Sequence, residues 1–311
     1  MSTKTAKSLS IILPAYNEEK SVGEVVTRLR SSFPEAEILV VNDSSTDATA
    51  QEALNAGARV VSHRYNMGNG AAIKTGARQA KGEVLVFMDA DGQHTDEAIQ
   101  SLLDKLEEGF ELVIGARNST GQANTGRWLG NHLLNRFASL LTGHKIQDLT
   151  SGFRAAYRDT FCQFLYLLPN GFSYPTTSTM AFMRSGYPVA FVPIHVHKRK
   201  AKSKSKINLV RDGTRFLVII MKITTLFSPM RVFFPISVLF FLIGLIRYLY
   251  FYWQTGGFSN MAGVMFSTSV LTFLIGLVSE QITALHYGMT PTYPVSDETI
   301  SESHAVEQSD S

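Results

Sequence analysis

The chain has 311 residues, of which 45% are hydrophobic and 18% charged, and its net charge is +3. A charged share below the usual value of about 25% indicates a large core or a membrane part. The apolar excess lies between residues 230 and 285, which favours a membrane part, and so small a net charge gives no reason to expect a nucleic-acid partner. The single cysteine, Cys162, excludes a disulfide within the chain and fits a reducing compartment.

The first part of the chain alternates between strand-like and helix-like segments. The first eight residues are polar and do not predict a signal peptide. Short apolar runs that end in polar residues, Gly or Pro predict strands at residues 9–13, 37–41, 58–62, 83–88 and 112–114. Apolar residues at helical spacing predict helices at residues 18–30, 46–55, 70–80, 95–108 and 126–142. This alternation predicts an α/β fold with a mainly parallel sheet and flanking helices.

Two later segments add to this sheet. Residues 148–154 form a polar turn that enters another strand. Residues 187–196 predict a late strand near an edge, because Pro188 and Pro193 cannot donate hydrogen bonds to a neighbouring strand.

Polar clusters follow three of the predicted strands, at residues 14–18, 42–47 and 89–94. Ligands of such sheets bind beyond the carboxyl ends of the strands, so the clusters predict one binding site. Asp89 and Asp91 can share a divalent cation with a diphosphate, and Gln93 offers a third oxygen; such hard ligands suit Mg²⁺ or Mn²⁺. A lone Asp-x-Asp pair also occurs in ordinary turns, so the prediction depends on the three clusters together.

Other nucleotide motifs are absent from the sequence. Residues 68–73 lack the last glycine of the dinucleotide fingerprint, and no glycine directly precedes Lys74 as a P-loop requires.

Several polar residues are open to a purely structural interpretation. Asp43 and Asp47 fit turn and N-cap positions, and Arg136 and Arg154 fit surface charges or salt bridges. The histidines are interpreted as surface or packing residues: His63, His94, His195 and His197.

The C-terminal third predicts a membrane part. Residues 198–206 are a basic run, and residues 207–227 form an apolar segment with Arg211, Arg215 and Lys222 on one helical face, as in a helix lying in a membrane interface. Residues 232–253 and 262–285 are each long enough to span a bilayer core, which needs about 20 residues. The alternative is two buried helices of a soluble protein. Glu280 lies near the inner end of its span, where a deeply buried charge would need a partner.

The positions of the basic residues predict how the hairpin is oriented in the membrane. The basic run precedes the first span and the link at residues 254–261 has no Lys or Arg, so the positive-inside rule predicts a cytoplasmic N-terminal part. The sequence therefore predicts five segments of the chain: a tail at residues 1–8, an α/β domain at 9–200, interfacial helices at 201–229, a transmembrane hairpin at 230–287 and a disordered acidic tail at 288–311.

The three polar clusters resemble the nucleotide-sugar motifs of family 2 glycosyltransferases, which have the GT-A fold. Residues 115–117 and 148–154 resemble the later motifs of the polyprenyl-phosphate branch, which includes dolichol-phosphate mannose synthases and bacterial polyprenyl-phosphate glucosyltransferases. The resemblance covers roughly residues 9–227, and the hairpin also fits the bacterial branch. One departure is at residues 42–45, where many members have two aspartates followed by glycine and this chain has Asn-Asp-Ser-Ser.

The resemblance implies the reaction and the roles of residues. It implies inverting transfer of a hexose from a UDP- or GDP-sugar to undecaprenyl or dolichyl phosphate, with Mg²⁺ or Mn²⁺ as cofactor. The implied nucleotide-sugar residues are Pro14, Tyr16, Glu18, Asn42, Asp43 and Asp89. The implied metal ligands are Asp89, Asp91 and Gln93, and the implied acceptor-phosphate residues are Arg117, Arg127 and Lys204. The implied catalytic residues are Asp91, Arg117 and Asp148.

The resemblance also implies partners and a location. The basic run is expected to meet anionic lipid headgroups. The hairpin is a candidate surface for homo-oligomers, and the implied location is a bacterial or archaeal plasma membrane.

A phosphate acceptor needs no strong base, because its second pKa near 6 leaves it largely dianionic at neutral pH. The metal would stabilise the leaving diphosphate. A single displacement predicts inversion, and Asp148 as a base suits a neutral hydroxyl acceptor better.

Four alternatives remain open. A processive polysaccharide synthase would carry Gln-x-x-Arg-Trp, but Asn124 stands at the Gln position and only two spans are predicted. The others are a transferase with a saccharide acceptor, a catalytically silent membrane scaffold and a sugar nucleotidyltransferase.

Overall fold

The computed structural model describes residues 7–117, 135–136, 139, 146–171, 173–194 and 228–288. The predicted interfacial helix lies outside these residues, as do the acidic tail beyond residue 288, Arg127, Lys204, His195 and His197. Of the helix predicted at residues 126–142, residues 135, 136 and 139 are described, and they are helical.

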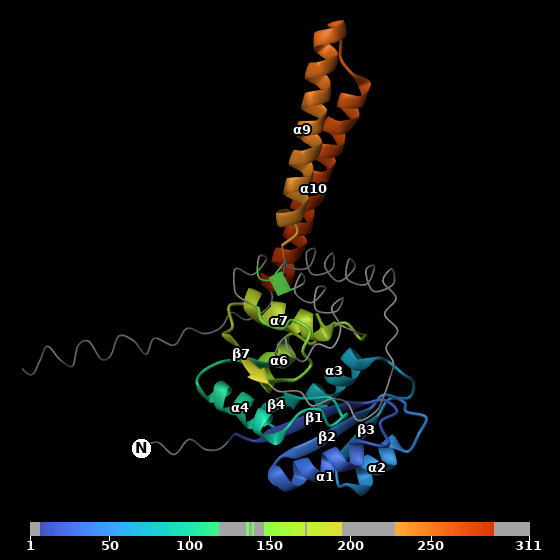
Figure 1. The fold of residues 1–311 in the computed structure, drawn as a ribbon, viewed down its shortest axis with the longest axis vertical. Coiled ribbons are helices and arrows are strands. Elements are labelled where there is room, and N and C mark those ends of the chain that lie inside the picture. Colours follow the sequence, from blue (N-terminus) through green and yellow to red (C-terminus); the bar gives the residue numbers. More distant parts are fainter. Residues whose placement is uncertain are drawn as a thin grey trace, which may run out of the picture.

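A seven-stranded sheet forms the centre of the α/β domain (Figure 1), with the strand order β3-β2-β1-β4-β6-β5-β7. Its strands are β1 Leu9–Ala15, β2 Glu37–Asn42, β3 Arg59–Ser62, β4 Val84–Phe87, β5 Leu112–Arg117, β6 Arg154–Tyr157 and β7 Val189–Ile194. All neighbouring strands are parallel except β6, which runs antiparallel to both β4 and β5. The predicted mainly parallel sheet is thus confirmed, and β7 lies at its edge as its prolines indicate.

The reversed direction of β6 brings its first residue to the functional edge of the sheet. Arg154 pairs with Phe87 near the carboxyl end of β4 and with Ile114 in β5. The turn at residues 148–153 therefore joins the loops that follow the parallel strands, although it precedes a strand rather than following one.

Helices cover both faces of the sheet, as shown in Figure 1. They are α1 Val22–Ser32, α2 Thr49–Asn55, α3 Asn69–Gln79, α4 Asp96–Glu107, α6 Arg158–Gln163 and α7 Tyr174–Arg184. Because side chains alternate along a strand, Ile11 and Ile12 enter different cores. Ile11 packs with residues of α1, α2 and α4, whereas Ile12 packs with residues of α3, α6 and α7. Thr95 caps α4, since its Oγ1 accepts a hydrogen bond from Ala98 N.

Two long helices, α9 Met230–Thr255 and α10 Asn260–Gly288, lie side by side and project away from the sheet (Figure 1). Both are long and apolar enough to cross a membrane. Ser237 Oγ donates to Ser269 O at 3.0 Å, and Ser269 Oγ donates to Ser237 O at 2.9 Å, which ties the helices together. Only 11% and 17% of their apolar windows are buried, so the alternative of two buried core helices is wrong.

Candidate active site

Loops after β1, β2 and β4 form one surface, here called the donor rim: residues 14–18, 42–47 and 89–94. The first two loops are cross-linked by hydrogen bonds. Asn17 Oδ1 accepts from Thr46 N at 2.9 Å, and Asn17 N donates to Ser45 Oγ at 3.0 Å. Ser45, to which the sequence assigned no role, therefore helps to hold the two motifs together.

Two donor-rim residues other than glycine have left-handed backbone angles. Asn17 has φ 56° and Ser44 has φ 61°. Ser44 stands where many members of the resembling family have glycine, and the left-handed region explains that preference because glycine has no Cβ to clash. Ser44 thus adopts the backbone conformation that glycine would have at this position, and its Cβ makes that conformation strained.

Asp43 is buried, with 4% of its surface exposed, and holds the chain that enters α3. Its Oδ1 accepts from Met67 N at 2.8 Å and its Oδ2 accepts from Gly68 N at 2.7 Å. The His63 ring lies between Asp43 and Thr75, with Nδ1 2.7 Å from Asp43 Oδ1 and Nε2 2.9 Å from Thr75 Oγ1. These contacts give Asp43 a positioning role, and its contact with the base stays a prediction.

Sequence reasoning placed His63 on the surface or in packing and missed this contact. The signal that finds it is the strand register. Asn42 pairs with Ser62 across β2 and β3, so the residues that follow both strands, Asp43 and His63, must be neighbours. Asn42 itself is fixed, since its Nδ2 donates to Ser62 Oγ at 3.1 Å and its Oδ1 accepts from Ser45 N at 3.0 Å.

The remaining predicted nucleotide residues lie along the donor rim. Tyr16 is 48% exposed, which leaves its ring able to contact a ligand, while Pro14 and Glu18 are half-buried. Glu18 Oε2 accepts from Ser21 Oγ at 3.0 Å at the start of α1.

The loop after β4 carries the three predicted metal ligands, Asp89, Asp91 and Gln93. Ala90 is buried while Asp89 is exposed and Asp91 half-buried, as expected when alternate residues face opposite ways. Asp91 Oδ1 accepts from Gln93 N at 3.2 Å, which tightens the loop. Among the described residues, no group of three or more His, Cys, Asp or Glu side chains could hold a metal ion alone. Two carboxylates with an amide nevertheless fit a Mg²⁺ or Mn²⁺ ion whose other ligands come from a diphosphate and water.

On the other side of β4 lies a charged group of residues, here called the acceptor corner: Arg117, residues 148–154 and Tyr174. Arg117 forms a two-point ion pair with Asp148, with Nε donating to Oδ2 at 2.7 Å and Nη2 donating to Oδ1 at 3.1 Å. Arg117 Nη2 also donates to Thr150 Oγ1 at 2.7 Å. Such two-point pairs fix the orientation of the guanidinium.

The ion pair sets the protonation of both partners. Burial alone would raise the pKa of Asp148, but the hydrogen bonds and charge of Arg117 outweigh it and hold that pKa below its usual range. Burial would lower the pKa of Arg117, yet Asp148 and, more weakly, Asp89 raise it. Asp148 is therefore an ionised partner of Arg117 and a poor proton acceptor. The loop after β4, which carries Asp89, lies beside this pair, because β4 is the neighbour of β6 in the sheet.

Arg154 is fully buried at the start of β6, so its interpretation as a surface charge is wrong. Its guanidinium donates to Ser151 O, to Pro175 O at 3.0 Å and to Ser178 Oγ at 2.5 Å. Burial lowers the pKa of Arg154 to about 10, which leaves it charged at neutral pH. The Arg154 side chain thus clamps the turn that carries Asp148 onto the first turns of α7.

Tyr174, the first residue of α7, completes the clamp. Its hydroxyl donates to Gly152 O at 3.1 Å, and the Arg154 guanidinium lies 5.6 Å from the centre of its ring. Burial raises the pKa of Tyr174, so the hydroxyl stays a proton donor.

His94 is a packing residue, as the sequence predicts. It is buried and its ring stacks on Phe153 at 4.2 Å between centroids. Burial, and then the charges of Arg117 and Arg28, lower the pKa of His94 to about 4. The imidazole is therefore neutral at physiological pH and joins the donor rim to the acceptor corner by apolar contact.

Asp47 also has the structural role that the sequence offers as one interpretation. Its Oδ1 accepts from Thr49 N at 3.0 Å and its Oδ2 accepts from Glu19 N at 3.3 Å. It thus secures the start of α2, although the helix itself begins two residues later, at Thr49.

Two family models match the chain. The model described as Glycosyl transferase family 2 matches residues 10–164, and the model described as GtrB C-terminal hairpin matches residues 228–285. The first match covers the donor rim, Arg117 and Arg154, and the second covers α9 and nearly all of α10.

Curated relatives share the α/β domain. The polyprenol monophosphomannose synthase of Mycolicibacterium smegmatis is 33% identical over 205 residues, which are 61% of this chain and 77% of the relative. The dolichyl-phosphate hexose transferase of Haloferax volcanii is 31% identical over 202 residues, which are 64% of this chain and 87% of the relative. The glycosyltransferase AglJ of the same organism is 28% identical and matches 67% of this chain and 69% of its own length.

Solved structures share the fold. Glucosyl-3-phosphoglycerate synthase from Mycobacterium tuberculosis, solved with Mn²⁺, UDP and phosphoglyceric acid, has a TM-score of 0.57 and 24% identity. The match covers 71% of this chain and 78% of that chain.

Proposed function

Since this chain belongs to the family 2 glycosyltransferases, we propose that it transfers a hexose, with inversion, from a UDP- or GDP-linked sugar to a polyprenyl phosphate. One observation carries the proposal: the loop that holds Asp89 and Asp91 packs against the turn of the Arg117–Asp148 pair, through His94 stacked on Phe153, in a chain with an apolar hairpin. This arrangement offers one site for a metal-bound diphosphate and another for a phosphate on a lipid. The names of the relatives, which act on polyprenol and dolichyl phosphates, support the choice of acceptor.

The donor rim is the proposed site of the nucleotide sugar. Asp89, Asp91 and Gln93 would hold Mg²⁺ or Mn²⁺, and structures that share the fold have been solved with either ion and UDP. A bound divalent ion would stabilise the negative charge of the leaving nucleoside diphosphate. The exposed Tyr16 ring is suited to stack on the base, and Asn42, Asp43, Glu18 and Pro14 would contact the rest of the nucleotide sugar.

The acceptor corner is the proposed site of the lipid phosphate. Among the described residues, the contacts of Arg117 use Nε and Nη2, so we assign the Nη1 edge to the acceptor. A phosphomonoester is mostly dianionic at pH 7 because its second pKa is near 6. One of its oxygens attacks the anomeric carbon, the bond from that carbon to the diphosphate breaks, and no proton has to be removed. Asp148 therefore orients Arg117 rather than acting as a base. Arg127 and Lys204 remain proposed phosphate ligands.

The hairpin is the proposed membrane anchor. The basic run at residues 198–206 precedes α9, and the link between α9 and α10 has no Lys or Arg, so we place the α/β domain on the cytoplasmic side. Anionic headgroups would attract the basic run. Oligomerisation through the hairpin is a further part of this proposal.

A transfer assay tests the proposal. Purified full-length protein would be given each of a panel of radiolabelled UDP- and GDP-sugars with undecaprenyl or dolichyl phosphate and Mg²⁺ or Mn²⁺. Label in a lipid product from one donor, absent with Asp91→Ala, is the expected result. Label on a saccharide acceptor instead would retain the donor site and refute the lipid acceptor. No turnover with any pair would favour the silent scaffold.

A further inference from the structure

Glu280 is the only acidic side chain in the described parts of the two candidate spans, and it has a partner outside them. Its Oε1 lies 3.7 Å from Nη2 of Arg184, the last residue of α7 in the α/β domain. The need for a partner, predicted from the sequence, is thus confirmed. The charged partner comes from a distant part of the chain, the end of α7.

Further contacts extend this pair into a cluster, here called the junction, of Arg184, Ser228, Met230 and Glu280. Glu280 Oε2 accepts from Met230 N, in the first turn of α9, at 3.3 Å. Arg184 Nη1 donates to Ser228 Oγ, just before α9, at 3.2 Å. One carboxylate and one guanidinium therefore connect α7, the start of α9 and the C-terminal part of α10. Figure 1 shows that α7 lies beside the end of the hairpin nearest the sheet.

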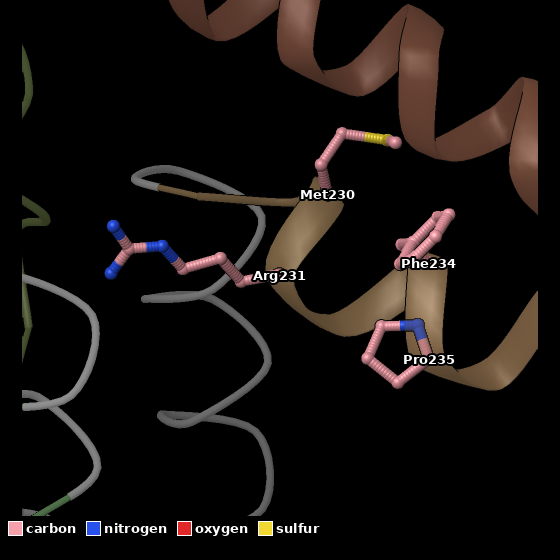
Figure 2. Close-up of a pocket in the computed structure, with 4 residues that line it drawn as sticks. All are labelled: Met230, Arg231, Phe234 and Pro235. Atoms are coloured by element: carbon pink, nitrogen blue, oxygen red, sulfur yellow. The ribbon is translucent and has the colours of Figure 1, made fainter.

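A wide surface hollow of about 570 Å³ lies beside the junction, at the first turn of α9. Figure 2 shows its lining residues, Met230, Arg231, Phe234 and Pro235, with the Arg231 side chain directed away from Met230.

The opposite end of α7 lies in the acceptor corner. Tyr174 donates to Gly152 O, and Arg154 donates to Pro175 O in the same first turn. The middle of α7 is packed in the core through Met180, Ala181 and Phe182. At 1.5 Å per residue, the helix spans about 15 Å and acts as one rigid element between the junction and the acceptor corner.

We propose that Arg184 and Glu280 are positioning residues that set the acceptor corner at the height and tilt that a membrane-bound acceptor phosphate requires. The inference rests on the proposed function, because only an acceptor confined to the membrane depends on that placement. A nucleotide sugar arrives from water and binds the donor rim at any orientation of the hairpin. Displacement of a reacting group by about 1 Å can lower a rate by about a hundredfold, so a loosened junction is enough to slow transfer.

The experiment compares two acceptors in proteoliposomes of the full-length protein: undecaprenyl phosphate in the bilayer and a short-chain isoprenyl phosphate that dissolves in water. The variants are Arg184→Gln, Glu280→Gln and the charge exchange Arg184→Glu with Glu280→Arg. The matched control is Gln281→Ala, an exposed neighbour on α10.

Each single variant is expected to lower kcat/KM for the bilayer acceptor by about tenfold, while the donor KM and kcat/KM for the soluble acceptor change by less than about twofold. The charge exchange should recover most of the loss, and the control should match the wild type. Equal losses on both acceptors would mean a merely structural role and overturn the inference, as would an unchanged rate with the bilayer acceptor.

Hydrogen exchange provides a readout that does not depend on turnover. In Glu280→Ala, the amides of residues 228–236 should exchange faster than in Gln281→Ala, because Met230 N loses its acceptor. Unchanged exchange would refute the junction itself. If the wild-type protein modifies neither acceptor, the proposed function fails and the inference on acceptor placement fails with it, while the exchange result still decides whether the contact anchors the hairpin.

Discussion

The donor rim and the acceptor corner lie at the same sheet edge but are held together in different ways. In the donor rim, side-chain oxygens mainly bind main-chain amides, as Asp43 does with Met67 and Gly68. In the acceptor corner, guanidinium groups hold the structure, through the Arg117–Asp148 ion pair and the buried Arg154. The shape of the donor rim is therefore set by the backbone, whereas that of the acceptor corner depends on charge and on α7.

This difference follows from the topology. The donor rim is built from loops after β1, β2 and β4, parallel strands that are neighbours in the sheet. The acceptor corner is built from the antiparallel β6 and the start of α7, which continues to the hairpin junction. A soluble donor needs a preformed surface, while a lipid acceptor needs a site whose position is linked to the membrane. Five substitutions can break or sharpen this comparison.

The largest effect is expected in the donor rim, from Asp91→Ala. Loss of this carboxylate should lower kcat/KM by roughly a thousandfold, because the charge of the leaving diphosphate would lose its metal-based stabilisation. Steady-state transfer assays would measure the loss, and Asp104→Ala, on the exposed side of α4, is the control. Turnover within tenfold of the wild type would refute the assignment of a metal site to the loop after β4.

In the acceptor corner, Arg117→Ala is expected to lower kcat/KM for the acceptor by about a hundredfold and to leave the donor KM unchanged. Arg117→Lys should recover only part of the loss, because an ammonium group cannot reproduce the two-point pair with Asp148. Titration of both substrates separates the two KM values. A rise in the donor KM that matches the loss would mean that the two regions are not functionally distinct.

The two regions also differ in how far the sequence predicts them. The donor rim is predictable because apolar runs that end in polar residues locate the ends of β1, β2 and β4, and parallel strands bring those ends to one edge. Its fine structure is not: the contact of His63 with Asp43 depends on the register of β2 and β3.

The acceptor corner is less predictable, since the direction of β6 is a tertiary property. Arg154 looks like a surface charge because arginine is seldom fully buried. Only the position of β6 between β4 and β5, with α7 covering its first residue, encloses the side chain. Likewise, the sequence shows that Glu280 needs a partner but does not identify Arg184.

The close contact between α3 and the segment before α7 can be tested with Gly70→Ala. A Cβ at residue 70 would lie 2.1 Å from Pro169 O, so the chain that leads into α7 must move. We expect a destabilisation of about 2 kcal/mol, which thermal unfolding in detergent would detect. Gly171→Ala is the matched control, because nothing lies within 4 Å of its Cβ position. Equal melting temperatures of the two variants would contradict the close contact.

Asp148→Asn tests whether charge holds the acceptor corner. Because Asp148 pairs with Arg117 instead of accepting a proton, transfer should fall by less than about tenfold, against about a hundredfold or more for loss of a general base. The folded pKa of Asp148 is below its ordinary value of 3.8, so its stabilising effect is fully present above that pH and is lost as the pH falls through the lower folded value.

The wild type should therefore be more stable than Asp148→Asn by about 1 kcal/mol at pH 7, a figure kept small because the Arg117 side chain is 37% exposed. The two proteins should converge well below pH 3.8. Thermal unfolding as a function of pH measures the stability difference at pH 7 and its loss at low pH, with Asp104→Asn as the exposed control. A difference that stays constant with pH would show that hydrogen bonding, not charge, holds the pair.

The smallest effect is expected from Ser44→Gly in the donor rim. The left-handed φ of 61° strains a serine by about 1 kcal/mol, and glycine relieves this but gains freedom in the unfolded chain. The net result should be a stabilisation of about 0.5 kcal/mol, seen as a slightly higher melting temperature. Ser44→Ala, which keeps the Cβ, should give no gain. If glycine lowered the melting temperature, the serine side chain itself would be holding the loop, and the donor rim would depend on more than its backbone.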